Sequence, residues 1–497
     1  MIACPQLPRI SFILIFAYSA FGPFLNGSTE PMKHIPAEVD FGKVYQTWDG
    51  FGFNYVETCQ SRDYEAWPQE YGGFSLLDES EKAEIIEAVF GESGLQVEIV
   101  KMFLDPWHQE EPGGAFDHER TTSNMLEFVE AGVALSREHG RNIEVITTLY
   151  GPPPWATHQG FIGGRDLDPA MMPALADYMI NWALFLRGRG INVKYLSIHN
   201  EGEDFYRWDY DDGTQRLEHF DYNAYWRPEE INAFILILAD RISELGIPDL
   251  GVTNGEPSNW TRFYNWGYAH PLADNPEVMQ RLGLLTTHGF INGDYSRLSY
   301  SSIDGRTTRL LREKKPDLRA WVTSYSWGKM DTIFAKVSHH HIYRAGVNAL
   351  IPWAGIQNPS QWLDGDPNPG NAITVHDDGS YELTTGYFLY KQLTQAGKRG
   401  MKVAHAMLAN PVANLIAFSG EPAALPDTFV VIENIFLWER PLKVVVRNSR
   451  HTRFRAFRTT QDGEERYVEV GVFEVEDGAI VYDAPFGSIT TFIGLEP

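Results

Sequence analysis

Residues 193–203, with the sequence VKYLSIHNEGE, carry the clearest signal of the fold. A strand-like run ends abruptly at His199, Asn200 and Glu201 and passes into a polar loop. In a (β/α)₈ barrel the catalytic groups lie where the strands end, because each strand directs a side chain towards the same end of the barrel. We therefore interpret Glu201 as a proton donor to a leaving oxygen and Asn200 as a ligand of a substrate hydroxyl. A solvated loop acid is the alternative interpretation of Glu201.

Strand-like and helix-like segments alternate on both sides of this stretch. Short β-rich runs are expected at 50–54, 97–104, 143–150, 193–199, 250–254, 284–288, 319–323 and 347–352. Amphipathic helical patterns lie between them, at 79–90, 123–139, 172–189, 228–245 and 332–345. Repeated alternation of this kind predicts an α/β fold in which a closed parallel (β/α)₈ TIM barrel occupies residues 48–396.

The pattern changes after about residue 397. Short strand-like runs follow, separated by Gly, Asp, Pro and Asn, and they predict a C-terminal all-β, sandwich-like domain over 397–497. The segment 37–47 is also β-like and precedes the first barrel strand.

The N-terminal segment differs in composition from the rest of the chain. Arg9 precedes an apolar run at 10–25, which is short for a membrane-spanning helix. We interpret residues 1–28 as a signal peptide and expect a secreted or periplasmic protein with no stable membrane insertion after its removal. A retained membrane anchor is the alternative.

Composition excludes several classes of function. The formal net charge of −25 argues against a nucleic-acid partner, because phosphates require a basic surface. The two cysteines are Cys4, inside the predicted signal, and Cys59, so no internal disulfide is expected after cleavage. The run 339–341 contains three histidines in a helical pattern, where consecutive side chains diverge and do not converge on one ion. We expect no metal and no cofactor.

Aromatic and histidine residues recur just after the predicted strands. The set comprises Trp107, Trp155, Trp208, Trp260, Trp266, His288, Trp327 and Trp353. An aromatic ring can bury its face against an apolar surface, such as the C–H face of a sugar, while its polar tip bonds a hydroxyl. Half-buried packing is the alternative for many of these residues individually. Their recurrence at one end of the barrel predicts a carbohydrate-binding cleft.

The chain resembles glycoside hydrolase family 30, part of a large retaining clan of (β/α)₈ glycosidases. The resemblance rests on Asp49-Gly50-Phe51-Gly52, the Pro-rich segment 150–155, Asn200-Glu201, Thr287-His288-Gly289 and Gly386-Tyr387. It implies hydrolysis of a β-linked polysaccharide or oligosaccharide, with Glu201 as the acid/base. It also implies that residues 37–47 join the C-terminal strands in one β-domain.

One departure from that family concerns the nucleophile, which is a Glu preceded by Thr after the seventh strand. Here Thr323 is followed by Ser324 and Tyr325. Four possibilities remain: inversion with a distant base, a displaced nucleophile, Tyr325 as the nucleophile, or an inactive site. Glu256, after the fifth strand, is the best candidate for the second carboxylate, and a structural turn acid is its alternative.

These observations predict a glycoside hydrolase with Glu201 and Glu256 as catalytic residues. The residues expected to bind the carbohydrate substrate are Asn200, Trp155, His288, Tyr325, Trp327, Trp353 and Trp107. Four cations are either contacts for uronate or sulfate groups or plain surface charges: Lys101, Arg165, Arg207 and Lys329. The alternative function is a non-catalytic carbohydrate-binding protein on a decayed glycosidase barrel, which the loss of the nucleophile favours.

Overall fold

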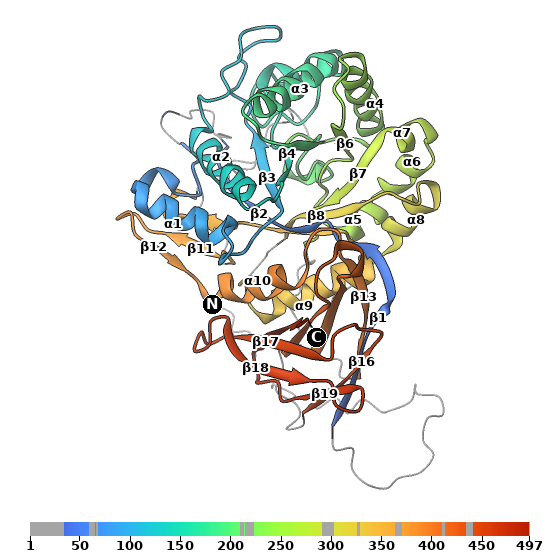
Figure 1. Cartoon of the computed structure of the whole chain (residues 1–497). Coiled ribbons are helices and arrows are strands. Elements are labelled where there is room, and N and C mark those ends of the chain that lie inside the picture. The colour runs from blue at the N-terminus through green and yellow to red at the C-terminus, as the bar shows by residue number, and fades with distance from the viewer. Residues whose placement is uncertain are drawn as a thin grey trace, which may run out of the picture.

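Eight parallel strands close into a barrel, and a separate β-domain packs beside it (Figure 1). The computed structural model describes residues 34–58, 65, 68–208, 213, 223–290, 303–325, 329–362, 370–409, 413–433 and 441–496. The predicted signal peptide, Cys59 and Trp327 lie outside these residues. No helix in the described part of the chain is both long and apolar enough to cross a membrane.

The barrel strands follow one another in chain order. They are β2 (Gly50–Asn54), β3 (Ile99–Leu104), β4 (Glu144–Leu149), β5 (Val193–Ser197), β6 (Gly251–Thr253), β7 (Leu282–Thr287), β8 (Ala320–Tyr325) and β9 (Ala349–Pro352). Strand β9 pairs in parallel with β2 and closes the ring. The predicted α/β barrel is therefore confirmed. Its strands are near-continuous apolar runs because helices cover their outer faces.

Helices surround the barrel and connect its strands. They are α1 (Glu79–Phe90), α2 (Ser123–Glu138), α3 (Met172–Gly188), α4 (Pro228–Glu244), α5 (Trp260–Asn265), α6 (Ala269–Ala273), α7 (Pro276–Arg281), α8 (Arg306–Lys314), α9 (Thr332–His340) and α10 (Thr385–Ala396). Helices α5 to α8 have no counterpart in the predicted pattern. Three of them have only five or six residues, which is too short to show an amphipathic period.

The lower part of the barrel interior is filled by apolar side chains. This inner cluster consists of Ile99, Ile146, Leu284, Trp321, Ala349 and Ile351. Such layers make a TIM barrel a packed core with no pore, so that polar groups gather only where the strands end.

The β-domain is one nine-stranded sheet that folds back on itself. Its strands are β1 (Ile35–Thr47), β13 (Lys402–Leu408), β14 (Ala413–Ser419), β15 (Thr428–Glu433), β16 (Leu442–Arg447), β17 (Arg453–Thr460), β18 (Val468–Glu474), β19 (Ala479–Tyr482) and β20 (Ser488–Gly494). Strand β1 pairs with β13 on one side and β16 on the other. The edge strands β18 and β19 meet through Phe473 and Tyr482, whose ring centroids are 5.6 Å apart. This contact lies beside the buried apolar core that the folded sheet encloses.

A buried glutamine on α10 connects the two domains. Gln392 donates to Thr459 Oγ1 at 2.9 Å and accepts from the backbone N–H of Thr491 at 3.1 Å. Helices α9 and α10 lie between the barrel and the β-domain in Figure 1. A small sheet of β10 (Ile356–Gln357), β11 (Ile373–Val375) and β12 (Tyr381–Leu383) follows the last barrel strand.

Candidate active site at the strand ends

Backbone hydrogen bonds join the ends of β5 and β6. The N–H of Glu201 donates to the carbonyl of Glu256 at 2.8 Å, and the N–H of Glu256 donates to the carbonyl of His199 at 2.9 Å. Glu201 has a φ of 43°, in the left-handed region that disfavours a residue with a side chain. Strained residues of this kind persist where the surrounding bonds over-determine them, and they cluster at functional sites.

The turn that carries Glu256 requires a glycine before it. Gly255 has a φ of 79°, and a Cβ there would lie 2.1 Å from Cδ2 of the His199 ring. On the other side, the Oδ1 of Asn254 accepts from the N–H of Thr286 at 2.8 Å, which ties β6 to β7. The position of Glu256 is therefore set from both neighbouring strands.

His288, at the end of β7, lies between the two candidate catalytic carboxylates. Its Nδ1 is 2.9 Å from Oε1 of Glu201, and its Nε2 is 3.0 Å from Oε2 of Glu256. Burial lowers the pKa of His288, but hydrogen bonds to the two carboxylates outweigh burial and raise the pKa above its ordinary value. The imidazolium form, which donates from both nitrogens, fits this position.

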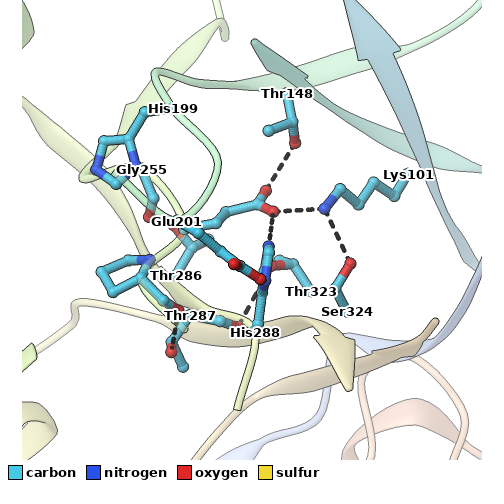
Figure 2. Close-up of polar contacts among 12 residues, drawn as sticks. Lys101, Thr148, His199, Glu201, Gly255, Thr286, Thr287, His288, Thr323 and Ser324 are labelled. Atoms are coloured by element: carbon cyan, nitrogen blue, oxygen red, sulfur yellow. Dashed lines mark hydrogen bonds and ion pairs between the residues drawn. The ribbon is translucent and has the colours of Figure 1, made fainter. Parts of the chain in front are cut away.

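Glu256 is held by three side chains from three further strands. Lys101 Nζ on β3 lies 2.5 Å from Oε2 of Glu256, and Thr148 Oγ1 on β4 donates to Oε1 at 2.7 Å. In Figure 2, dashed lines from Lys101, Thr148 and His288 meet at one unlabelled carboxylate, which their hydrogen bonds identify as that of Glu256. Burial raises the pKa of Glu256, but Lys101 and His288 more than offset it and lower the pKa to about 2. The carboxylate is therefore ionised at neutral pH.

These four charged groups form a line from the barrel interior to the surface. The side chains of Lys101 and Glu256 are 0% exposed, that of His288 is 4% exposed, and that of Glu201 is 14% exposed. Charges alternate along the line, so each buried charge has a partner of opposite sign. Glu201 is the member that a substrate can reach, since it is the most exposed.

The end of β8 contributes a hydroxyl group to this network. Ser324 is buried, and its Oγ accepts from Lys101 Nζ at 3.0 Å. Tyr325 directs its hydroxyl to Ser338 on α9, and its ring stacks on Phe334 with centroids 4.5 Å apart. Substrate binding by Tyr325 stays a prediction; burial raises the pKa of its hydroxyl, which favours the un-ionised phenol.

The remaining predicted site residues differ in their surroundings. Asn200 is buried, and its Oδ1 has no hydrogen-bond partner among the residues that the structure describes. Trp155 is half-buried and donates from Nε1 to the carbonyl of Gln109 at 3.1 Å. Trp353 and Trp107 are also half-buried. Their roles, like that of Trp327, stay predictions.

Of the four cations singled out in the sequence, Lys101 is the one within the network. It lies inside the barrel, not on the surface, and contacts no solvent. Arg165 instead pairs with Asp166 at 2.8 Å, and Lys329 is exposed. The side chain of Arg207 is outside the described part of the chain. A charged residue inside the apolar run IVKMFL of β3 was the signal for a buried ion pair, because lysine is almost never fully buried without a partner.

A metal ion requires several potential ligands that are arranged around it. In the described ranges, no group of three or more His, Cys, Asp or Glu side chains is arranged to hold a metal ion. His339 is half-buried and His341 is buried, and burial lowers the pKa of each to about 3, which keeps both rings neutral.

Comparison with known proteins places this geometry in context. No sequence-family profile matches the chain, and no curated protein matches it by sequence. Solved structures match over most of its length. The catalytic domain of a GH30 xylanase C from Talaromyces cellulolyticus aligns with 93% of this chain and 100% of its own, at 14% identity and a TM-score of 0.68.

Two further solved structures also match the chain over most of its length. A GH30 endoxylanase from Clostridium papyrosolvens C71 covers 93% of this chain and 100% of its own, at 15% identity and a TM-score of 0.65. An endo-β1,6-glucanase covers 93% and 94%, at 14% identity and a TM-score of 0.67. The chain shares the fold of glycoside hydrolase family 30. At these identities the likeness establishes the barrel and its β-domain, and the chemistry has to be argued from the residues themselves.

Proposed function

We propose that this protein is a secreted glycoside hydrolase that cleaves O-glycosidic bonds in a β-linked polysaccharide or its oligosaccharides. The observation that carries the proposal is the bridge from Glu201 through His288 to Glu256 at the strand ends. Two carboxyl groups with different environments are what glycoside hydrolysis requires. The fold shared with xylanases and an endo-β1,6-glucanase supports a β-linked substrate.

Glu201 is the general acid of this proposal. It is the exposed end of the charged line, so it can reach the oxygen of the leaving sugar. Asn200 precedes it, and the unpartnered Oδ1 of Asn200 accepts a hydrogen bond from the hydroxyl next to the reacting carbon. A buried acceptor without a partner is costly, so an incoming hydroxyl that bonds to it stabilises the complex.

Glu256 is the second carboxylate and acts as the base. The His288 ring and two hydrogen bonds separate it from Glu201, a spacing that favours the inverting arrangement, about 6.5–9.5 Å, over the retaining one, about 5–5.5 Å. In this mechanism the proton shared by His288 Nδ1 and Glu201 Oε1 moves onto Glu201, and Glu201 gives it to the leaving oxygen. Water loses its proton to Glu256 and attacks the anomeric carbon from the opposite face.

Secretion rests on the apolar run at residues 10–25 behind Arg9, which has the length of a signal core. One solved structure of similar fold is described as a conserved exported protein from Bacteroides fragilis, at 14% identity and a TM-score of 0.67.

The testing experiment measures release of reducing ends across a panel of β-linked polysaccharides. We expect Glu201→Gln to lower turnover by about 10²–10⁴-fold, because the amide keeps the shape but donates no acidic proton. Proton NMR of the first product should show inverted configuration. Near-full activity of Glu201→Gln would refute the assignment, and a retained product would refute Glu256 as a base.

A second candidate function is a non-catalytic carbohydrate-binding protein. The observation that favours it is the complete burial of Glu256, whose two oxygens are already bonded by Lys101, Thr148 and His288. Glycan binding without hydrolysis of any member of the panel would support this function and reject the first.

A further inference from the structure

Lys101 contacts two side chains that follow or end different barrel strands, Glu256 and Ser324. Its Nζ lies 2.5 Å from Glu256 Oε2 and 3.0 Å from Ser324 Oγ, at the end of β8. At the end of β8 the hydroxyl of Ser324 therefore meets a buried ammonium group, and the carboxylate of Glu256 reaches the same ammonium from the end of β6. All three side chains are buried.

We propose that Lys101 is the positioning residue of this site: by bridging Ser324 Oγ and Glu256 Oε2 it fixes the carboxylate of Glu256 between the ends of β6 and β8 and supplies its counter-charge. This inference rests on the proposed function, because Glu256 has a catalytic role only if the protein hydrolyses a glycan.

The charge on Lys101 decides between this role and a Ser–Lys nucleophile. In a Ser–Lys pair the amine must be neutral to take the hydroxyl proton. Burial lowers the pKa of Lys101, and the carboxylate of Glu256 opposes this shift. Because the pKa of Glu256 is itself lowered to about 2, the pair is an ammonium and a carboxylate, and the ammonium donates to Ser324. Ser324 thus accepts a hydrogen bond from Lys101 and is not an attacking group.

The surroundings of Glu256 support ionisation by Lys101. The titratable groups that face it are Lys101 from β3, His288 from the end of β7 and His199 from the end of β5. Burial lowers the pKa of His199 to about 3, so that ring is neutral and contributes no positive charge. His288 is hydrogen-bonded to both Glu201 and Glu256. Lys101 is hydrogen-bonded to Glu256 but not to Glu201.

The test compares Lys101→Met with Thr148→Val. Lys101→Met keeps the length and removes the charge, so we expect Glu256 to be protonated near pH 5. With hydrolysis as the readout, kcat at pH 5 should fall by about 10²-fold or more, with KM within about threefold. Activity should recover as pH rises through the new pKa. Thr148→Val removes one uncharged donor to the same carboxylate, and kcat should fall about tenfold.

A matched control is Lys398→Met, which removes a half-buried lysine near Glu98 at the opposite end of the barrel. It should lower stability but leave the pH profile of kcat unchanged. The ionisation of Glu256 is read separately from the ¹³C shift of its carboxyl carbon, assigned with Glu256→Gln.

The outcomes separate the two proposals. An active parent whose kcat and Glu256 ionisation are both unchanged in Lys101→Met would overturn the positioning role while leaving hydrolysis intact. A parent that hydrolyses nothing would reject the proposed function and the catalytic role of Lys101 with it. The ¹³C shift would then still show whether Lys101 holds Glu256 ionised. If Lys101→Met does not fold, Thr148→Val tests the same carboxylate, and an unchanged kcat there would count against the proposal.

Discussion

Two buried carboxylates at opposite ends of the barrel have opposite pKa shifts. Asp49 precedes β2 at the lower end of the barrel, where the strands begin. It forms an ion pair with Arg319 and accepts a hydrogen bond from Trp321 Nε1 at 2.9 Å. Burial raises the pKa of Asp49 to about 6, and Arg319 opposes this only in part. Glu256, at the upper end, has its pKa lowered to about 2.

The exposure of the partner cation explains the difference. The side chain of Arg319 is 48% exposed, so solvent screens its charge, whereas that of Lys101 is 0% exposed. A buried cation has little water around it and interacts with a neighbouring carboxylate at low effective dielectric. The comparison teaches that burial of a carboxylate alone does not set the direction of its shift: two buried cations, Lys101 and His288, reverse the effect of burial at Glu256, and the half-exposed Arg319 does not at Asp49.

The largest expected effect is on stability when one partner of the upper pair is removed. Glu256→Gln leaves Lys101 buried without a counter-charge, and the free energy of unfolding should fall by about 3–5 kcal/mol. In Asp49→Asn the exposed Arg319 keeps its hydration, and the expected loss is below about 1.5 kcal/mol. Urea unfolding at pH 7 measures both. Equal losses would contradict the role given to the buried cation.

The second prediction concerns pH. The folded-state pKa of Asp49, about 6, lies above its ordinary value of 3.8. Between these values the folded chain binds more protons, so this group's contribution to stability is present below 3.8 and is lost as pH rises through 6. Glu256 has the opposite sign: its contribution is present above 4.5 and is lost as pH falls towards 2.

The measurement is the free energy of unfolding at several pH values for the parent and the two variants. Asp49→Asn should flatten the curve between pH 4 and 6, by at most about 1.4 kcal/mol per pH unit for one proton. Glu256→Gln should flatten it below pH 4.5. Curves that stay parallel to the parent would show that neither group titrates as described.

Much of the fold could be predicted from the sequence, because each barrel element carries its own local signal. An apolar strand such as β3 or a helix of three or more turns such as α4 is recognisable on its own. The helices α5 to α7 were missed, since elements of five or six residues span fewer than two helical turns and cannot show a repeated apolar pattern. Their helical state comes from packing against neighbours.

The site could be predicted only in part, and for a related reason. The sequence singled out Glu201, Glu256 and His288 because each one follows the end of a strand, which is a local feature, and the structure brings the three side chains together. The bonds from Lys101 to Glu256 and Ser324 join residues far apart in the chain, and they exist because the barrel closes and brings β3, β6 and β8 together. Local patterns give the ends of strands but not the pairing of side chains across the ring.

The smallest expected effect comes from the exposed cation of the lower pair. Arg319→Gln removes a charge that water already screens, so the free energy of unfolding at pH 7 should change by less than about 1 kcal/mol. The direction of the pKa change is still defined: without Arg319 the pKa of Asp49 should rise further, because the charge that opposes burial is gone. Carboxyl ¹³C NMR of Asp49 checks this. A loss of unfolding free energy comparable to that of Glu256→Gln would mean that an exposed cation stabilises a buried carboxylate as strongly as a buried cation does. The contrast between the two ends of the barrel would then have a cause other than the burial of the partner cation.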